Sequence, residues 1–294
     1  MELSKYGVWT VALDLQPAPV AREAAAEIES LGWGAIWIPE AVNREVMANS
    51  MLLLGATERI VVATGIANLH ARTAMAMSGG HKTITSAHPD RFLLGIGVSH
   101  QVAVEGFYKQ TYDKPLSTMR SYLDGMDTGL FFAAPPPVEP VRVLAALGPK
   151  MLELAREKAS GAHPYFVPVE HTPIAREILG AGKILAPEQA VVLDANPETA
   201  RATARAHMQT YLGLPNYTNN LRRLGWGDDD LGNGGSDKLV DAIVAWGSTD
   251  EVVARINAHH DAGADHVAVQ VLTADPRALP MPQWRELASA LNLG

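Results

Sequence analysis

The chain has 294 residues, a formal net charge of −8 at pH 7 and no cysteine. The lack of cysteine excludes disulfide bonds, thiolate metal sites and thiol nucleophiles, and it is consistent with a reducing cytoplasm. No block of lysine and arginine occurs in the sequence, so the electrostatic footprint of a nucleic-acid or anionic-membrane partner is missing.

The composition indicates a globular protein, with 47% hydrophobic and 19% charged residues. Met1–Tyr6 lacks the basic start and the apolar core of a signal peptide. No apolar stretch reaches the ~18 residues that a membrane span needs. We therefore expect a soluble, cytoplasmic protein with a sizeable core, built as one large barrel or as two ordinary domains.

Short apolar runs between turn residues predict eight strands. The predicted strands are Gly7–Leu13, Ala35–Pro39, Ile60–Ile66, Phe92–Gly97, Val141–Ala146, Ala162–Phe166, Ala190–Leu193 and His266–Leu272. Alanine- and leucine-rich patterns, several with a proline or Asn/Thr start signal, predict the helices between them. The predicted helices are Pro19–Leu31, Ala74–Ala87, Leu116–Leu130, Met151–Ala159, Pro173–Leu179, Pro197–Leu212 and Thr249–Ala262.

The regular alternation of strand and helix predicts an α/β fold with a parallel sheet. Runs such as Ile60–Ala63 are apolar on both faces, which is typical of strands covered by helices on each side. Eight such units predict a (β/α)8 TIM barrel, and without a linker we expect a single domain over residues 1–294.

Two connections, after the fourth and seventh strands, are insertion candidates, because roughly 45 and roughly 70 residues far exceed usual loop lengths. The second includes an apolar segment, Lys238–Trp246, predicted to be a helix. It also includes the acidic turn Asp228–Gly235, whose spacing does not match a calcium loop, so we interpret it as a solvated turn.

The most informative run is Arg91–His100, an apolar strand that leads through two glycines to a histidine. In a parallel barrel the active site lies where the strands end, and histidine can transfer protons near neutral pH. His100 is therefore a candidate acid or base, although a buried structural histidine would give the same pattern. After the second strand, Glu40 could relay a proton or could be a solvent-exposed loop carboxylate. After the third, Asn68 could bind the edge of a heterocycle.

The start of the fifth helix, Gly148–Met151, could bind a phosphate through free backbone N–H groups, or it could simply turn the chain. His207, His259 and His260 fall within helical patterns and are interpreted as packing or surface residues. No HxH or HExxH pair occurs, so we expect no metal site. No G-x-S-x-G elbow occurs, so the sequence gives no indication of a serine hydrolase.

Taken in order, several segments resemble the luciferase-like monooxygenase superfamily, and within it the oxidoreductases that use coenzyme F420. The resemblance spans nearly the whole chain, and its ordered set of motifs is fairly specific. The segments that carry it are Gly32–Glu40, Arg91–His100, Tyr112–Asp124, Leu144–Met151 and Gly161–Phe166. The resemblance implies a bacterial-luciferase type of barrel that holds a flavin-like ring across its mouth, usually in a homodimer.

The resemblance also implies positions for the coenzyme. A bend beneath the tricyclic ring, often a non-prolyl cis peptide, falls near Thr64–Ile66. The loop along the ring and ribityl chain falls on Gly97–His100, and the turn near the coenzyme tail on Ala145–Pro149. The candidate cofactor-binding residues are Thr64, Gly65, Ile66, Asn68, Gly97, Val98, Ser99, Ala145, Ala146, Gly148, Pro149, Lys150 and His163.

Two positions depart from the pattern of the deazaflavin-using relatives. Many of these relatives have a histidine directly after the acidic residue of the second strand, where this chain has Ala41. They also often have a glutamate at the position of His100. The proton-transfer role could therefore have moved to His100, or the protein could use another coenzyme or different chemistry.

The expected function is hydride transfer between a bound deazaflavin, coenzyme F420, and a small organic substrate. His100 would exchange the proton, and Glu40 would tune or position it. The first alternative is an FMN-dependent monooxygenase on the same fold, supplied with reduced flavin by a separate reductase. The second is a flavin-binding barrel without turnover. The substrate itself is not predicted, because the loops Gln101–Asp113 and Asn216–Gly235 shape the mouth.

Overall fold

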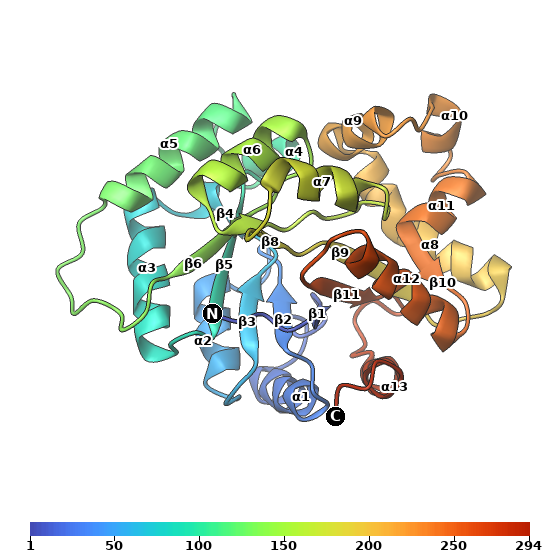
Figure 1. Cartoon of the computed structure of the whole chain (residues 1–294), viewed down its shortest axis with the longest axis horizontal. Coiled ribbons are helices and arrows are strands. Elements are labelled where there is room, and N and C mark those ends of the chain that lie inside the picture. The colour runs from blue at the N-terminus through green and yellow to red at the C-terminus, as the bar shows by residue number, and fades with distance from the viewer.

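A computed structural model describes all 294 residues. The strands are β1 (Tyr6–Trp9), β2 (Ala35–Ile38), β3 (Val61–Thr64), β4 (Ala67–Asn68), β5 (Phe92–Gly97), β6 (Val141–Leu144), β7 (Gly161–Ala162), β8 (Ile184–Leu185), β9 (Glu188–Val192), β10 (Val244–Trp246) and β11 (Val267–Val271). Helices surround them on the outside (Figure 1).

The helices follow the strands in alternation over most of the chain. They are α1 (Ala18–Ser30), α2 (Val46–Leu54), α3 (Ala74–Ala87), α4 (Gln101–Gly106), α5 (Pro115–Thr128), α6 (Pro149–Lys158), α7 (His171–Leu179), α8 (Pro197–Leu212), α9 (Pro215–Arg223), α10 (Asp228–Leu231), α11 (Asp237–Ile243), α12 (Thr249–Asp261) and α13 (Met281–Ala290). None of them combines the length and the apolar composition that crossing a membrane requires.

The sheet is parallel and closes into an eight-membered ring. Its order runs β10-β9-β11-β1-β2-β3-β5-β6-β7-β8, and β4 additionally pairs with β5. Only Ala186 and Pro187 separate β8 from β9, so one continuous segment pairs with β7 through its first part and with β11 through its second. The TIM-barrel fold predicted from the sequence is confirmed, and β10 lies outside the ring, paired with the end of β9.

Alternation along the strands divides the core into two layers. Trp9, Trp37 and Ala63 belong to a cluster inside the barrel, whereas Val8 and Ile36, one residue before Trp9 and Trp37, belong to the larger cluster packed beneath the helices. Successive side chains of a strand point to opposite faces, so a short strand can contribute to both layers. Fully buried aromatic rings thus fill the barrel interior below the ends of the strands.

Three predicted elements need correction. The strand expected over Gly7–Leu13 ends at Trp9, and a turn follows it in which the Asp14 N–H donates to the Val11 carbonyl oxygen. The helix expected over Lys238–Trp246 ends at Ile243, because pairing with β9 gives the backbone of Val244–Trp246 its partners as strand β10. The strand expected over Ala162–Phe166 is only Gly161–Ala162, and Phe166 has a φ of 58°, which a strand cannot accommodate. Helices α3 and α8 have the predicted bounds.

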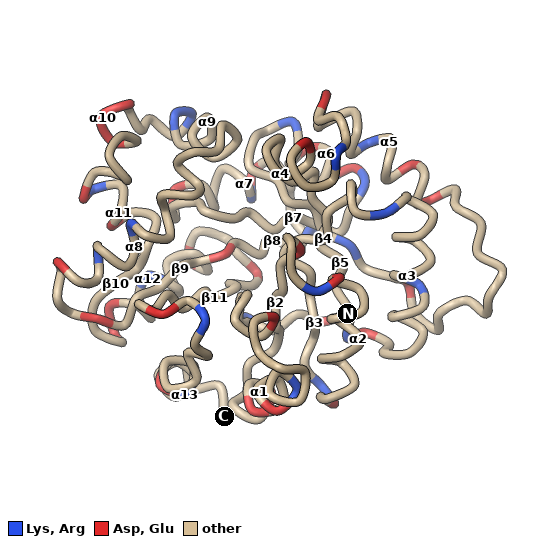
Figure 2. The backbone as a smooth tube through the Cα atoms, turned by 180° about the vertical axis from the view of Figure 1, so that it is seen from behind, with Lys and Arg blue, Asp and Glu red and all other residues tan.

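The two long connections place their helices around the mouth of the barrel. The connection between β5 and β6 holds α4 and α5, and the one between β9 and β11 holds α8 to α12 with β10. A separate apolar cluster joins α8, α9 and α11 to Phe166 and the end of β9. Figure 1 shows α9 and α10 beyond the strand ends, at the same end of the molecule as α4. Figure 2 shows basic and acidic residues interspersed along the backbone of the helices and loops.

Candidate active site

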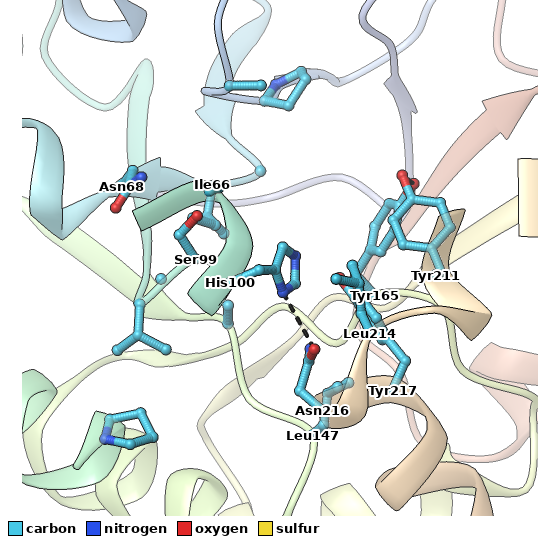
Figure 3. Close-up of a pocket in the computed structure, with 18 of the residues that line it drawn as sticks. Ile66, Asn68, Ser99, His100, Leu147, Tyr165, Tyr211, Leu214, Asn216 and Tyr217 are labelled. Atoms are coloured by element: carbon cyan, nitrogen blue, oxygen red, sulfur yellow. Dashed lines mark hydrogen bonds between the residues drawn. The ribbon is translucent and has the colours of Figure 1, made fainter. Parts of the chain in front are cut away.

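A cavity of about 470 Å³ lies at the C-terminal ends of the barrel strands. Segments that follow β2, β3, β5, β6 and β7 line its inner part, and residues of α4 and α9 line its outer part. Figure 3 shows His100 between Ile66 and Ser99 on one side and Tyr165 and Tyr211 on the other. Segments far apart in the sequence thus converge on one cavity, at the end where TIM barrels carry their active sites.

Most residues selected from the sequence line this cavity. They are Glu40, Gly65, Ile66, Asn68, Gly97, Val98, Ser99, His100, Ala145, Ala146, Gly148 and His163. Thr64, Pro149 and Lys150 do not line it. The Thr64 hydroxyl donates to the Gly95 carbonyl oxygen at 2.7 Å, and the side chains of Pro149 and Lys150 are exposed at the start of α6.

His100 is half-buried and stands at the N-cap position of α4. The preceding Ser99 has a φ of 58°, a left-handed conformation that ends the extended path of β5. His100 Nδ1 lies 3.2 Å from Oδ1 of Asn216 (Figure 3), and the His100 ring centroid is 5.4 Å from that of Tyr217. Burial lowers the pKa of His100, and the Asn216 hydrogen bond raises it by less. The surroundings of His100 therefore favour the neutral form of its imidazole.

The Glu40 carboxylate is already occupied by protein groups. Its Oε2 accepts from Arg72 Nη1 at 2.9 Å and from the backbone N–H of Asn68 at 2.7 Å, and its Oε1 accepts from Arg72 Nη2. The Glu40 side chain is 5% exposed, and Arg72 also pairs with Glu45 at 2.5 Å. This geometry joins the end of β2 to β4, and it favours a positioning role for Glu40.

The cavity floor is formed by Gly65 and the aromatic interior of the barrel. The peptide bond between Gly65 and Ile66 is cis, at the position that the resemblance implied. His163 Nδ1 donates to the Ala186 carbonyl oxygen at 2.6 Å, and its ring stacks on Trp37 with centroids 4.2 Å apart. Burial lowers the pKa of His163 to about 4, so this imidazole is neutral.

Tyrosines form the cavity wall opposite Ile66. The Tyr165 hydroxyl donates to Gln270 Oε1 at 2.9 Å, and it lies 2.8 Å from the Tyr211 hydroxyl, which must then be the donor between the two. The nearby Glu188 side chain is fully buried and accepts from the Phe166 backbone N–H at 3.2 Å. Burial raises the pKa of Glu188 to about 8, so this wall carries no net charge at neutral pH.

The far end of the cavity can receive an anionic group. Gly148 is the N-cap residue of α6 and makes no side-chain cap. Pro149 has no N–H and the Met151 N–H donates to the Gly148 carbonyl oxygen, so the Lys150 N–H is the one left without a backbone partner at this helix terminus. The Arg223 guanidinium from α9 lies beside Gly148, with Nη1 3.1 Å from where a Cβ on that glycine would stand. Helix terminus and guanidinium together suit a phosphate.

Several lining residues were not selected from the sequence. They are Trp9, Phe107, Tyr108, Tyr112, Tyr165, Tyr211, Leu214, Asn216, Tyr217 and Arg223. Most of these belong to loops and to α9, whose conformation the sequence did not define, and Tyr211 lies near the end of the correctly predicted α8. The only signal available was the position of Tyr165 shortly after the sixth strand, together with the unusual length of the seventh connection.

Comparison with known proteins shows the same fold and identifies the family. A family model described as luciferase-like monooxygenase matches residues 5–266. The chain is 27% identical over 242 residues to a protein of Mycobacterium tuberculosis whose name describes it as a candidate coenzyme F420-dependent oxidoreductase, with 68% of each chain covered.

Solved structures resemble the chain over nearly its whole length. An F420-dependent secondary alcohol dehydrogenase, in complex with an F420–acetone adduct, has a TM-score of 0.79 at 12% identity, with 100% of this chain and 99% of that chain covered. The oxygenating constituent of 3,6-diketocamphane monooxygenase from Pseudomonas putida, in complex with FMN, has a TM-score of 0.67 at 14% identity, with 97% and 96% covered. At these identities the likeness shows the fold, and with the family match it establishes that the chain belongs to the luciferase-like monooxygenase family.

Proposed function

We propose that this protein is an oxidoreductase that transfers a hydride between bound coenzyme F420 and a small organic substrate. The observation that carries the proposal is the His100 imidazole in the wall of an apolar cavity at the ends of the barrel strands. The name of the Mycobacterium tuberculosis relative supports F420 as the coenzyme. We further propose that the protein forms a homodimer and acts in the cytoplasm.

The cavity residues fit a flat heterocycle with an anionic tail. Of its 31 lining residues, 17 are hydrophobic, which suits the faces of a tricyclic ring. A Cβ on Gly97 would come 2.5 Å from Ile66 Cδ1, so glycine keeps the space beside Ile66 open. Gly148 and Arg223 would bind the phosphate of the tail, and Asn68 would bind a polar edge of the ring.

When bound, the deazaflavin supplies the carbon that gives or accepts the hydride. His100 would take a proton from the substrate during its oxidation and return one during its reduction. Glu40 would hold Asn68 and the end of β2 in place through its bonds to Arg72. Phe107 and Tyr108, which line the outer part of the cavity, would limit the access of water.

An FMN-dependent monooxygenase, supplied by a separate reductase, is the second candidate. Ala41 favours it, since this residue lines the cavity where deazaflavin-using relatives often have a histidine. The two candidates differ in their response to oxygen. A deazaflavin hydride-transfer enzyme would work equally well under air and under nitrogen, whereas a monooxygenase would consume oxygen.

The test is a titration of the purified protein with F420 and with FMN, followed by fluorescence quenching. Saturable binding of F420 that is much tighter than binding of FMN supports the proposal. Tight binding of FMN alone, with oxygen uptake from the reduced coenzyme in an oxygen electrode, supports the monooxygenase. If neither coenzyme binds, both candidates are wrong.

A further inference from the structure

We propose that Asn216 is a positioning residue that fixes the tautomer and the orientation of the His100 ring. Asn216 belongs to the first turn of α9, and His100 precedes the first turn of α4, so the contact joins two connections on opposite sides of the cavity (Figure 3). The inference deepens the proposed function, because it concerns the same proton-transfer group.

The hydrogen bond defines which ring nitrogen carries the proton. Asn216 Oδ1 can only accept, so the 3.2 Å contact requires a hydrogen on His100 Nδ1. In the neutral form of the imidazole, Nε2 then carries the lone pair. The ring has no other hydrogen-bond partner in the protein, which leaves Nε2 as the nitrogen available to a ligand. In this tautomer His100 can accept a proton without first rotating.

The position of Asn216 is supported by buried neighbours on α9. Tyr217 and Leu221 pack into the cluster formed with Phe166, α8 and α11. Asn216 itself is exposed at the mouth of the cavity, directly beside the buried Tyr217. The helix therefore holds the amide in place although water reaches it, and the Tyr217 ring limits the rotation of His100 from the same side.

No charged side chain pairs with His100, so the effect of Asn216 on the pKa of His100 can be measured directly. The titratable groups around it are Tyr217 on α9, Tyr112, whose hydroxyl donates to the Ser99 carbonyl oxygen at 3.5 Å, and Glu105 on α4, which accepts from Gln101. No ion pair involves His100. A change at position 216 is therefore the most direct way to alter the proton equilibrium of this ring.

The test is nitrogen-15 NMR of the histidine rings in the full-length protein without coenzyme, titrated with acid. The His100 signals are assigned by their loss in His100→Gln.

We expect wild-type His100 to be protonated at Nδ1 when neutral. Asn216→Asp places a carboxylate at the same distance and should raise the pKa of His100 by roughly one unit or more. Asn216→Leu removes the acceptor, so it should lower that pKa and abolish the preference for Nδ1. Thr218→Val, on the same helix but outside the cavity, is the matched control. It should change neither the pKa nor the tautomer of His100.

A wild-type His100 protonated at Nε2 would overturn the proposal, because Asn216 would then act as the donor. Equal pKa values and tautomers in wild type, Asn216→Asp and Asn216→Leu would overturn it as well. Circular dichroism of each variant shows whether it is folded. Because none of these measurements needs a coenzyme or a substrate, their outcome is independent of the F420 titration, and either proposal can fail alone.

Discussion

At the scale of single residues, His100 and Glu40 have opposite surroundings. His100 faces the cavity with one ring nitrogen unpartnered, whereas the Glu40 carboxylate is surrounded by donors from Arg72, Asn68 and Val46. Sequence reasoning assigned proton chemistry to both, since both follow barrel strands. The distinction depends on Arg72, which lies 32 residues from Glu40 in the chain. No sequence motif predicts that these two residues form an ion pair.

Replacement of His100 tests its part in proton transfer. We expect His100→Ala to lower kcat about 10²–10⁴-fold, the usual contribution of a general acid or base, and to leave the affinity for the coenzyme nearly unchanged. Steady-state kinetics and the fluorescence titration measure the two effects separately. His88→Ala, at the far end of α3, is the control. A large loss of affinity with normal turnover would instead make His100 a coenzyme-binding residue.

Replacement of Glu40 separates a positioning role from an acid–base role. Glu40→Gln leaves the mostly buried Arg72 with only the half-exposed Glu45 as an ionic partner, so we expect a loss of about 3 kcal/mol in the free energy of unfolding. Coenzyme affinity should fall with it, because Asn68 loses its carboxylate acceptor. Urea denaturation and the titration measure these effects, with Arg72→Met as the partner variant. A changed pH profile with unchanged stability would contradict this and restore a proton-transfer role.

At the scale of elements, the two glycines of strand β5, Gly95 and Gly97, have different structural roles. A Cβ on Gly95 would overlap the carbonyl oxygen of Thr64 in the neighbouring strand β3, whereas a Cβ on Gly97 would meet the side chains of Ile66 and Ala145. The sequence does not distinguish the two glycines, which both lie between the apolar strand and His100. In the structure, Gly95 serves the contact between strands, and Gly97 serves the cavity.

The two glycines therefore predict two different defects. Gly95→Ala should cost ~3 kcal/mol or more of stability, because backbone must move to admit the methyl group. Gly97→Ala should be nearly as stable as wild type, since the end of Ile66 can move, but it should bind the coenzyme more weakly as Ile66 enters the cavity. Urea denaturation and coenzyme titration of both variants check this. Equal losses of stability would show that Gly97 also holds strands together.

Element prediction succeeded where local signals were strong. Helix α8 begins after Asn196, whose side chain accepts from the N–H of Glu198 at 2.9 Å, and its first residue is proline. Helix α2 gave no such pattern, because Val46–Leu54 is apolar around most of its circumference. Strand β10 could not be predicted either, since its conformation depends on pairing with β9, more than 50 residues away.

At the scale of the whole molecule, the fold buries several histidines in the neutral form. Burial lowers the pKa of His163 and His207 to about 4 and that of His81, His259 and His266 to about 3. In the unfolded chain these groups have a pKa near 6.5. Their contribution to stability is complete above pH 6.5, and it is lost as the pH falls toward the folded-state values.

Two buried carboxyl groups act in the opposite direction. Burial raises the pKa of Glu188 to about 8 and that of Asp14 to about 6, so acid favours the folded state through them. Five histidines against two carboxyls leave about three protons taken up on unfolding, or about 4 kcal/mol of stability lost per pH unit between roughly pH 6 and 4.5.

We therefore expect Tm to be nearly constant above pH 7 and to fall steeply below pH 6, with cooperative unfolding near pH 5. At that slope, a total stability of about 5–15 kcal/mol is lost within roughly one to four pH units. Urea denaturation at a series of pH values measures the proton uptake directly. The variant His207→Gln has no titratable group at this position, so it should take up about one proton fewer on unfolding. The substitution is suitable because His207 Nε2 makes no hydrogen bond that glutamine would have to replace. A stability that stays flat down to pH 4.5 would contradict the prediction, because it would mean that the buried imidazoles become protonated without leaving the fold.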